Sequence, residues 1–204
     1  MARPRNQEAR KRELVSVTSR LLIERGQAGA RLVDIAEAAS LTPAAVSYYY
    51  PDLADLYADT YETATEQYLT RRRQQVSEIA PAVERLIECI ALGVPHAGTS
   101  SRAATVLLME LSALAIRQER IVASGLEFEA EQLRLFGEIL DQGVAEGTMR
   151  LPYGAVETAR AILAVEDGIA IPVVAGRLPS DEALRVTLSV ATSLTGADLL
   201  AARG

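Results

Sequence analysis

Residues 32–50 read LVDIAEAASLTPAAVSYYY. Apolar residues recur in the first half of this stretch at three- and four-residue intervals, which predicts a short helix over residues 32–39. Thr42 followed by Pro43 is typical of a helix N-terminus, because a threonine side chain caps a free backbone N–H group and proline is tolerated in the first turn. Pro51 ends this second helix. Two short helices joined by a tight turn form a helix-turn-helix, whose second helix can enter a DNA groove.

Helical spacing of apolar residues continues on both sides of this stretch, and short β-branched runs occur only inside longer helical patterns. We therefore predict an all-α protein. The other expected helices cover residues 7–25, 53–79, 82–92, 101–118, 121–144, 152–174 and 180–194. No linker is long enough to separate independent domains. The sequence predicts a small DNA-binding helix-turn-helix domain at residues 1–52 and a larger helical body at residues 53–204.

Residues 8–60 resemble the DNA-binding domain of TetR-family (tetracycline-repressor-like) transcriptional regulators. The residues that carry the resemblance are a helix that ends at Gly26, the sequence Asp34-Ile35-Ala36, a helix that begins at Thr42, and an aromatic cluster that ends at Tyr50. The resemblance implies a three-helix DNA-binding domain on a body that binds an effector and forms a homodimer. It implies a ligand-responsive regulator, a repressor that a small molecule releases from a palindromic DNA operator. The sequence identifies neither the effector nor the target genes.

The chain departs from the common pattern of this family at four positions. Ser40 stands where a turn glycine is common, Ser47 replaces a tyrosine, and Leu53 replaces a lysine. Ala30 or Arg31 stands where threonine or serine usually precedes the second helix. These differences concern the contacts with DNA rather than the fold.

Charge is divided unevenly along the chain. A basic end on an acidic body is typical of a protein that contacts a polyanion with one end only. Residues 1–50 carry eight basic and five acidic side chains, whereas the whole chain has a formal net charge of -6. The alternative reading of the basic end is a solvated tail. The residues that we expect at DNA are Arg3, Arg5, Arg31, Thr42, Pro43, Ala44, Ala45, Ser47, Tyr48 and Tyr49.

Each of these residue types suits one kind of DNA contact. Ala44 and Ala45 lie in the first turn of the second helix and are small enough to approach base edges and thymine methyl groups. Ser47 can bond to either a base or a phosphate. The hydroxyl groups of Tyr48 and Tyr49 can bond to phosphates, although packing in the core is the alternative for these tyrosines. Arg3 and the neighbouring basic residues form an arm for phosphates or a minor groove, or else a solvated tail.

The helical body is expected to hold a small molecule and to pair with a second copy. The candidate ligand-binding residues are Tyr57, Tyr61, Tyr68, Met109, Phe128 and Phe136. The three tyrosines share one side of a helix, so they line either an apolar pocket or a plain hydrophobic core. Apolar residues lie on two sides of the last two helices, which predicts a four-helix dimer interface or, alternatively, two central helices of the monomer.

Other classes of protein have little support. No Gly-rich nucleotide motif, P-loop, nucleophile elbow or zinc-protease motif occurs, and one Cys with one His cannot make a four-ligand zinc site. We therefore expect no enzyme activity, no cofactor and no metal. Neither a signal peptide nor a membrane span is indicated, so a cytoplasmic location is expected. The alternative function is an all-helical protein-binding adaptor, or a small-molecule-binding protein that does not bind DNA.

Overall fold

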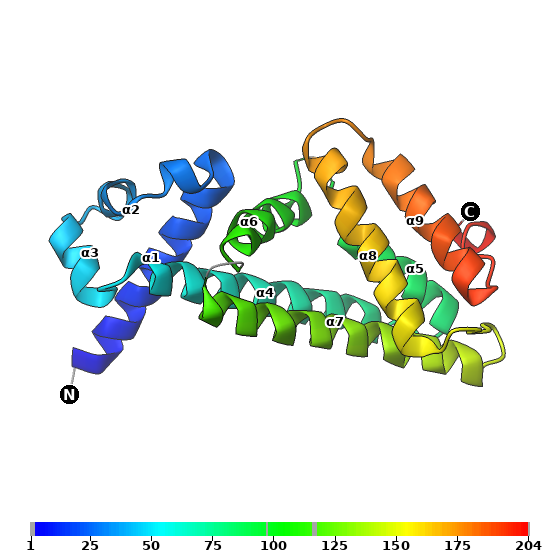
Figure 1. Ribbon diagram of the computed structural model, residues 1–204. Helices are drawn as coiled ribbons and strands as arrows, with labels where there is room; N and C mark the ends of the chain where they lie inside the picture. Colours follow the sequence, from blue (N-terminus) through cyan, green and yellow to red (C-terminus); the bar gives the residue numbers. More distant parts are fainter. Residues whose placement is uncertain (1–2, 97, 116–117, 204) are drawn as a thin grey trace. The chain divides into compact units, whose positions relative to one another are not determined.

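The computed structural model of the chain describes residues 3–96, 98–115 and 118–203 (Figure 1). Within these residues it contains α-helices, two short 3-10 segments and no strand, which confirms the predicted all-α class. The helices are α1 (Arg3–Arg25), α2 (Leu32–Ala38), α3 (Pro43–Tyr49), α4 (Leu53–Ser77), α5 (Ala82–Gly93), α6 (Ser100–Ala115), α7 (Glu119–Ala145), α8 (Ala155–Val174) and α9 (Ser180–Thr195). The 3-10 segments are Gln27–Gly29 and Ala201–Arg203.

Most helix ends lie within a few residues of the expected positions. α1 begins at Arg3 rather than at residue 7, and α8 begins at Ala155 rather than at residue 152. Gly154 precedes α8 with a φ of 84°, a left-handed conformation that does not belong to a helix. Among the described residues, no helix combines the length and the apolar composition needed to cross a membrane.

The chain forms two compact units. Unit 1 comprises Met1–Gln67 and Val106–Leu126, and unit 2 comprises Tyr68–Thr105 and Glu127–Gly204. Unit 1 therefore contains the whole of the predicted helix-turn-helix domain together with parts of α4, α6 and α7. The functional division that we place after residue 52 stays a prediction.

The core of unit 1 joins the helix-turn-helix to its supporting helices. α2 packs on α3, and both contact α1. The fully buried apolar side chains of this core include Leu14, Leu22, Ile35, Val46, Leu56, Leu111 and Ile121. They come from α1, α2, α3, α4, α6 and α7, so burial of apolar surface fixes the short helices α2 and α3, which are too short to be stable alone.

The core of unit 2 lies among α5, α7, α8 and α9. α8 packs against α9, and α9 also contacts α5. Its fully buried side chains include Leu86, Ile90, Leu135, Phe136, Ile139, Ile162, Leu184 and Leu188. This core buries one side of α8 and one side of α9.

The turn between α2 and α3 depends on a residue with unusual backbone geometry. Ser40 has a φ of 55°, the only non-glycine residue in the described part of the chain with a positive value. Its backbone N–H bonds to the Glu37 carbonyl, and the Leu41 N–H bonds to the Ala36 carbonyl at 2.8 Å. A side chain in the left-handed region costs roughly 1–2 kcal/mol, so the turn carries strain that glycine would avoid.

Replacing Ser40 by glycine is expected to raise the free energy of unfolding by about 0.5–1 kcal/mol. The strain at the Cβ atom is removed, while the greater freedom of glycine in the unfolded chain offsets part of the gain. Urea unfolding monitored by circular dichroism measures the change. Ser40→Ala, which keeps the Cβ atom, is the control and should give no gain. A glycine variant that unfolds at a lower urea concentration than the wild type would contradict this explanation of the turn.

Candidate functional site

The helix-turn-helix begins its second helix as the sequence indicates. Thr42 is the N-cap of α3, and its hydroxyl oxygen accepts the Ala45 backbone N–H at 3.2 Å. Pro43 occupies the first turn, where no donor is needed. The Val46 side chain is fully buried and fixes one face of α3 against the core of unit 1.

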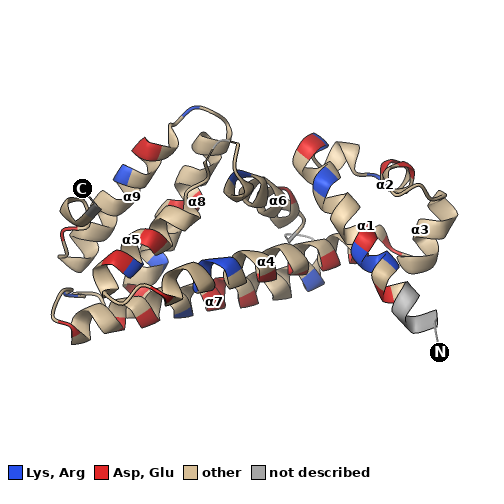
Figure 2. Ribbon diagram, turned by 180° about the vertical axis from the view of Figure 1, so that it is seen from behind, with Lys and Arg blue, Asp and Glu red and all other residues tan. Residues whose placement is uncertain are grey.

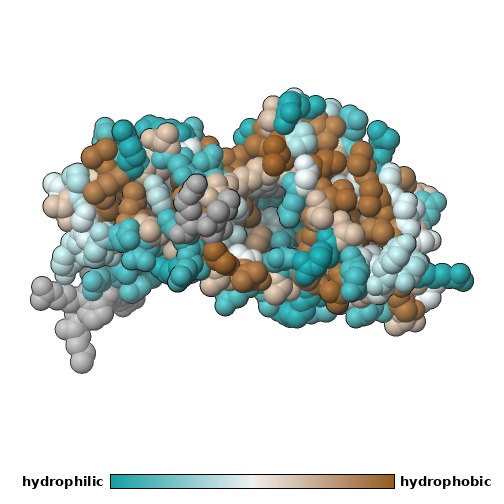
Figure 3. Space-filling view, in the orientation of Figure 1, coloured by the Kyte–Doolittle hydropathy of each residue, from teal (hydrophilic) through white to brown (hydrophobic). Residues whose placement is uncertain are grey.

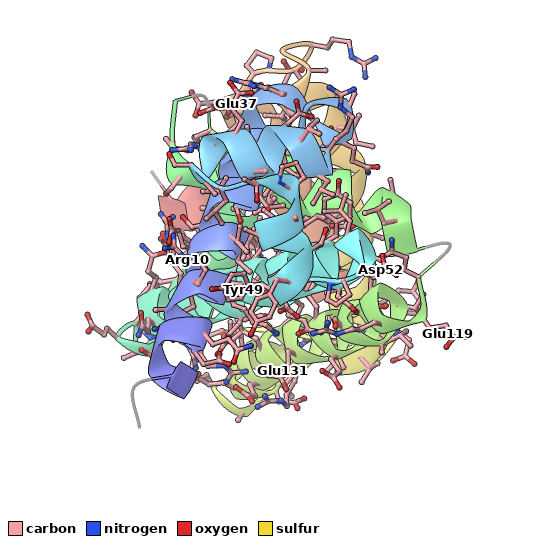
Figure 4. All side chains as sticks on the ribbon, turned by 90° about the vertical axis from the view of Figure 1, so that its left-hand side faces the viewer. Arg10, Glu37, Tyr49, Asp52, Glu119 and Glu131 are labelled. Atoms are coloured by element: carbon pink, nitrogen blue, oxygen red, sulfur yellow. The ribbon has the colours of Figure 1, made fainter. Side chains whose placement is uncertain are left out.

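The opposite face of α3 is open to solvent. Thr42, Pro43, Ala44 and Tyr48 are exposed, with 67% of the Tyr48 side chain accessible, and Ala45, Ser47 and Tyr49 are partly buried. The Tyr48 ring packs edge-on against the Tyr49 ring, with 5.2 Å between the ring centroids. Figure 4 labels Tyr49 on this short helix. Thr42, Pro43, Ala44 and Tyr48 therefore form an exposed surface without a charged side chain, whereas Tyr49 packs against the core of unit 1.

Arg31 caps α2 instead of the serine or threonine that is common there. Its backbone N–H donates to the Asp34 carboxylate at 3.1 Å, and its guanidinium Nε donates to the same oxygen at 2.9 Å. The guanidinium holds the pKa of Asp34 below its usual range. Arg31 remains largely exposed, so a charged group stands at the start of α2, although Asp34 already neutralises it.

Helix α1 carries the basic residues of the N-terminal segment. Figure 2 shows basic and acidic residues interspersed along it. Arg10, also labelled in Figure 4, donates to the Glu13 carboxylate at 2.7 Å. The side chains of Arg3 and Arg5 lie outside the described residues, although the backbone of both residues is part of α1.

The candidate ligand-binding residues divide between the two units. Tyr57, Tyr61 and Met109 belong to unit 1, whereas Tyr68, Phe128 and Phe136 belong to unit 2. Tyr57 donates its hydroxyl to the Ala30 carbonyl at 3.0 Å, which ties α4 to the start of the helix-turn-helix. Tyr61 is buried in the core of unit 1.

The three aromatic residues of unit 2 do come together, around a buried arginine that the sequence did not single out. The rings of Tyr68 and Phe128 lie edge to face, 5.5 Å apart. The guanidinium carbon of Arg72 lies 4.8 Å from the centroid of Phe136 and 5.7 Å from that of Tyr68. Faces of aromatic rings attract such a cation.

Arg72 is 2% exposed, and every N–H of its guanidinium has a partner. Nε and Nη2 donate to the Cys89 carbonyl, Nη1 donates to the Tyr68 hydroxyl and to Gln132, and Nη2 donates to both oxygens of Glu166 at 2.8 and 2.9 Å. We call Arg72, Glu166, Gln132 and Tyr68 the buried polar cluster. Five satisfied donors leave Arg72 none to offer a ligand.

Glu166 is the buried acid of this cluster. Burial raises the pKa of its carboxyl to about 7, against the opposing effect of the Arg72 charge. A Cβ atom on Gly93 would lie only 2.4 Å from a Glu166 oxygen, so glycine is needed where α5 passes this carboxylate. One sequence signal could have revealed the cluster, namely a charged residue on the buried stripe of a helix. On α4, Arg72 lies between Tyr68 and Val76. On α8, Glu166 lies between Ile162 and Ala170.

Helices α8 and α9 keep apolar side chains on the surface of unit 2. Val156 and Ile171 on α8 are 59% and 56% exposed, and Val186 on α9 is 39% exposed. On the face seen in Figure 3, apolar side chains gather over these two helices. Both helices therefore have one apolar side in the core and further apolar residues outside it.

The chain is similar to known proteins in its three-dimensional structure. No protein-family model and no curated protein sequence matches the chain. A transcriptional regulator from Saccharomonospora viridis, solved in complex with choline, superposes with a TM-score of 0.84 at 22% identity, over 92% of this chain and 97% of its own. A TetR-family regulator from Rhodococcus sp. superposes with a TM-score of 0.74 at 17% identity, over 91% of this chain and 97% of its own. A TetR regulator from Haloarcula marismortui superposes with a TM-score of 0.71 at 19% identity, over 92% of this chain and 99% of its own.

The fold is that of the TetR-family transcriptional regulators. This confirms the resemblance seen in the sequence, at the level of the fold. It also explains two departures from the common TetR pattern. Ser40 adopts the left-handed geometry that a turn glycine would supply. Leu53 is half-buried against the core of unit 1, which is a packing role that the lysine common in TetR proteins would fill less well.

Proposed function

We propose that the chain is a ligand-responsive, DNA-binding transcriptional regulator, and that α3 is its recognition helix. The observation that carries this proposal is the division of α3 into a buried side and an exposed side. Val46 is fully buried, whereas Ala44, two residues before it, and Tyr48, two residues after it, are exposed. A helix-turn-helix reads DNA with residues on such an exposed face.

The uncharged surface of α3 suits readout of bases and phosphates by small and hydroxyl-bearing groups. Ala44 and Ala45 allow close approach to base edges, and the exposed Tyr48 hydroxyl can donate to a phosphate. Attraction to the duplex then has to come from neighbouring basic groups, chiefly the arginines of α1, because Asp34 already pairs with Arg31. Repression of a gene and a palindromic operator belong to the proposal.

A small organic molecule is proposed as the effector. The support is the fold, since the similar regulator from Saccharomonospora viridis was solved in complex with choline. The aromatic residues Tyr68 and Phe128 in unit 2 are partly exposed, in contrast to the fully buried Phe136. We retain these two residues of unit 2 as candidate ligand contacts.

A homodimer is also proposed, with α8 and α9 as the paired helices. The exposed side chains of Val156, Ile171 and Val186 support it, because a surface with several large apolar residues on adjacent helices is typical of a protein interface. Two copies related by a two-fold axis present two recognition helices to DNA.

The experiment that tests DNA binding compares two charge variants. Ala44→Glu adds a negative charge to the exposed side of α3, and Ala130→Glu adds the same charge to an exposed position of α7 in unit 2. Fluorescence anisotropy with a labelled duplex, enriched from a random pool by the wild-type protein, should show at least a tenfold loss of affinity for Ala44→Glu only. Equal affinity of both variants and the wild type would show that α3 does not face DNA.

The adaptor alternative makes a different prediction in the same assay. A helical adaptor that binds only proteins would show no salt-dependent affinity for any duplex. A DNA-binding regulator loses affinity steeply as salt rises, because each neutralised phosphate releases counterions.

A further inference from the structure

Tyr50 directly follows the recognition helix and is held on three sides. Its backbone N–H donates to the Val46 carbonyl at 2.9 Å, which closes the last turn of α3. Its ring is buried, and the Lys11 amine lies 5.0 Å from the ring centroid. Its hydroxyl donates to Asp59 Oδ2 on α4 at 2.6 Å. The position of the Tyr50 side chain therefore fixes the C-terminal end of α3.

Asp59 is shared between Tyr50 and an arginine on α7. While Oδ2 accepts from Tyr50, Oδ1 accepts from Arg120 Nη2 at 2.5 Å. The same Nη2 donates to Glu62 Oε2 at 2.8 Å, and the Ser124 hydroxyl donates to Glu62 Oε1 at 3.2 Å. All these residues belong to unit 1. A continuous chain of hydrogen bonds thus runs from the first turns of α7 through α4 to the end of α3.

We propose that Asp59 and Arg120 are positioning residues for DNA recognition, which act on α3 through Tyr50. The inference rests on the proposed DNA-binding function. A carboxylate that accepts from two groups in fixed directions is itself fixed, and bonds to charged partners are the stronger kind. Arg120 orients the Asp59 carboxylate, Asp59 orients the Tyr50 hydroxyl, and Tyr50 orients the last turn of α3, which carries Tyr48 and Tyr49.

The network acts on orientation far more than on stability. The Arg120 side chain is 45% exposed, and exposed ion pairs contribute only about 0–1 kcal/mol to folding. A binding surface, by contrast, loses affinity when its supporting contacts let it move by about 1 Å. Loss of Arg120 should therefore show in the discrimination between DNA sequences and hardly in the unfolding curve.

The test uses the full chain and two duplexes of equal length, one enriched from a random pool by the wild type and one unrelated. The ratio of their dissociation constants measures specificity. Arg120→Gln and Tyr50→Phe should each lower this ratio about fivefold, with the midpoint of thermal unfolding nearly unchanged for Arg120→Gln. The double variant should lose no more than either single variant, because both break the same chain of bonds.

Three further variants separate the role of Asp59 from a general effect of losing a surface charge. Asp59→Asn keeps an oxygen acceptor for Tyr50 and should lose less specificity than Asp59→Ala, which leaves the buried Tyr50 hydroxyl without its acceptor. Arg134→Gln removes an arginine of similar exposure that pairs with Glu131 and Glu138 elsewhere on α7, and should leave the ratio unchanged.

The outcomes separate this inference from the proposed function. If the wild type enriches no duplex, the DNA-binding proposal fails. If the wild type binds its duplex but Arg120→Gln and Tyr50→Phe keep the full specificity ratio, or lose it additively, the positioning role is wrong.

Discussion

Replacing Arg72 by methionine is expected to lower the free energy of unfolding by about 3–5 kcal/mol. Methionine fills much of the space of the arginine stem but leaves the Glu166 carboxylate buried without its cation. The substitution also removes the donors to the Cys89 carbonyl and to Gln132, which are buried in the same place. Urea unfolding of the full chain measures the loss.

The matched control for this prediction is Arg134→Met on α7. Arg134 is 53% exposed and pairs with Glu131 and Glu138, so its loss should cost less than about 1 kcal/mol. The double variant Arg72→Met with Glu166→Gln should recover part of the stability, since no charge is left buried. A single Arg72→Met variant as stable as the control would mean that the buried polar cluster does not hold unit 2 together.

The Arg72→Met variant should also become more sensitive to alkaline pH. Burial raises the pKa of Glu166 to about 7 with Arg72 present, and loss of the positive charge raises it further. The folded state then binds a proton more tightly than the unfolded state, whose carboxyl has an ordinary pKa near 4.3. The free energy of unfolding is therefore greatest at a pH below the unfolded pKa and falls as the pH rises through the folded pKa of Glu166.

Placing aspartate at Ile171 and Val186 is expected to abolish the homodimer and weaken operator binding by about 100-fold or more. Both side chains are exposed on α8 and α9, so the charges should leave the fold of unit 2 intact. In a dimer interface, however, two copies would bury unpaired carboxylates. The loss in DNA affinity follows because joining two binding modules raises affinity by about 10²–10⁴-fold.

Sedimentation velocity and anisotropy on a duplex with two half-sites measure these two effects. Leu126→Asp is the control, because Leu126 is 63% exposed and belongs to α7 in unit 1 rather than to α8 or α9. It should leave the dimer unchanged. A wild type that sediments as a monomer, or a double variant that remains dimeric, would show that these faces of α8 and α9 are not paired.

Local sequence signals predicted the helix-turn-helix because each of its parts depends on neighbouring residues. Thr42 caps the helix that Pro43 begins, and its hydroxyl oxygen accepts the N–H three residues on. The periodic spacing that places Ile35 and Val46 inside is visible in 19 letters of sequence, residues 32–50. Propensity and burial agree here, which is the condition under which a sequence specifies its structure.

The pairing of residues within the buried polar cluster could not be predicted in the same way. Arg72 stands in the run Arg71-Arg72-Arg73, which reads as a solvated face, and only the structure brings it to Glu166, 94 residues further along the chain. The same limit applies to Tyr50, Asp59 and Arg120, whose bonds connect three helices. A charge inside a core requires a partner, but periodicity does not identify which partner.

Selection of binding sites from a random duplex pool, with footprinting of the enriched sequence, tests the central claim most directly. If α3 of two paired copies reads DNA, the selected sequence should contain two inverted half-sites whose centres lie about one helical turn, or a multiple of it, apart. Both half-sites should be protected together. Enrichment of no sequence, or protection of a single asymmetric site by one copy of the chain, would contradict the account.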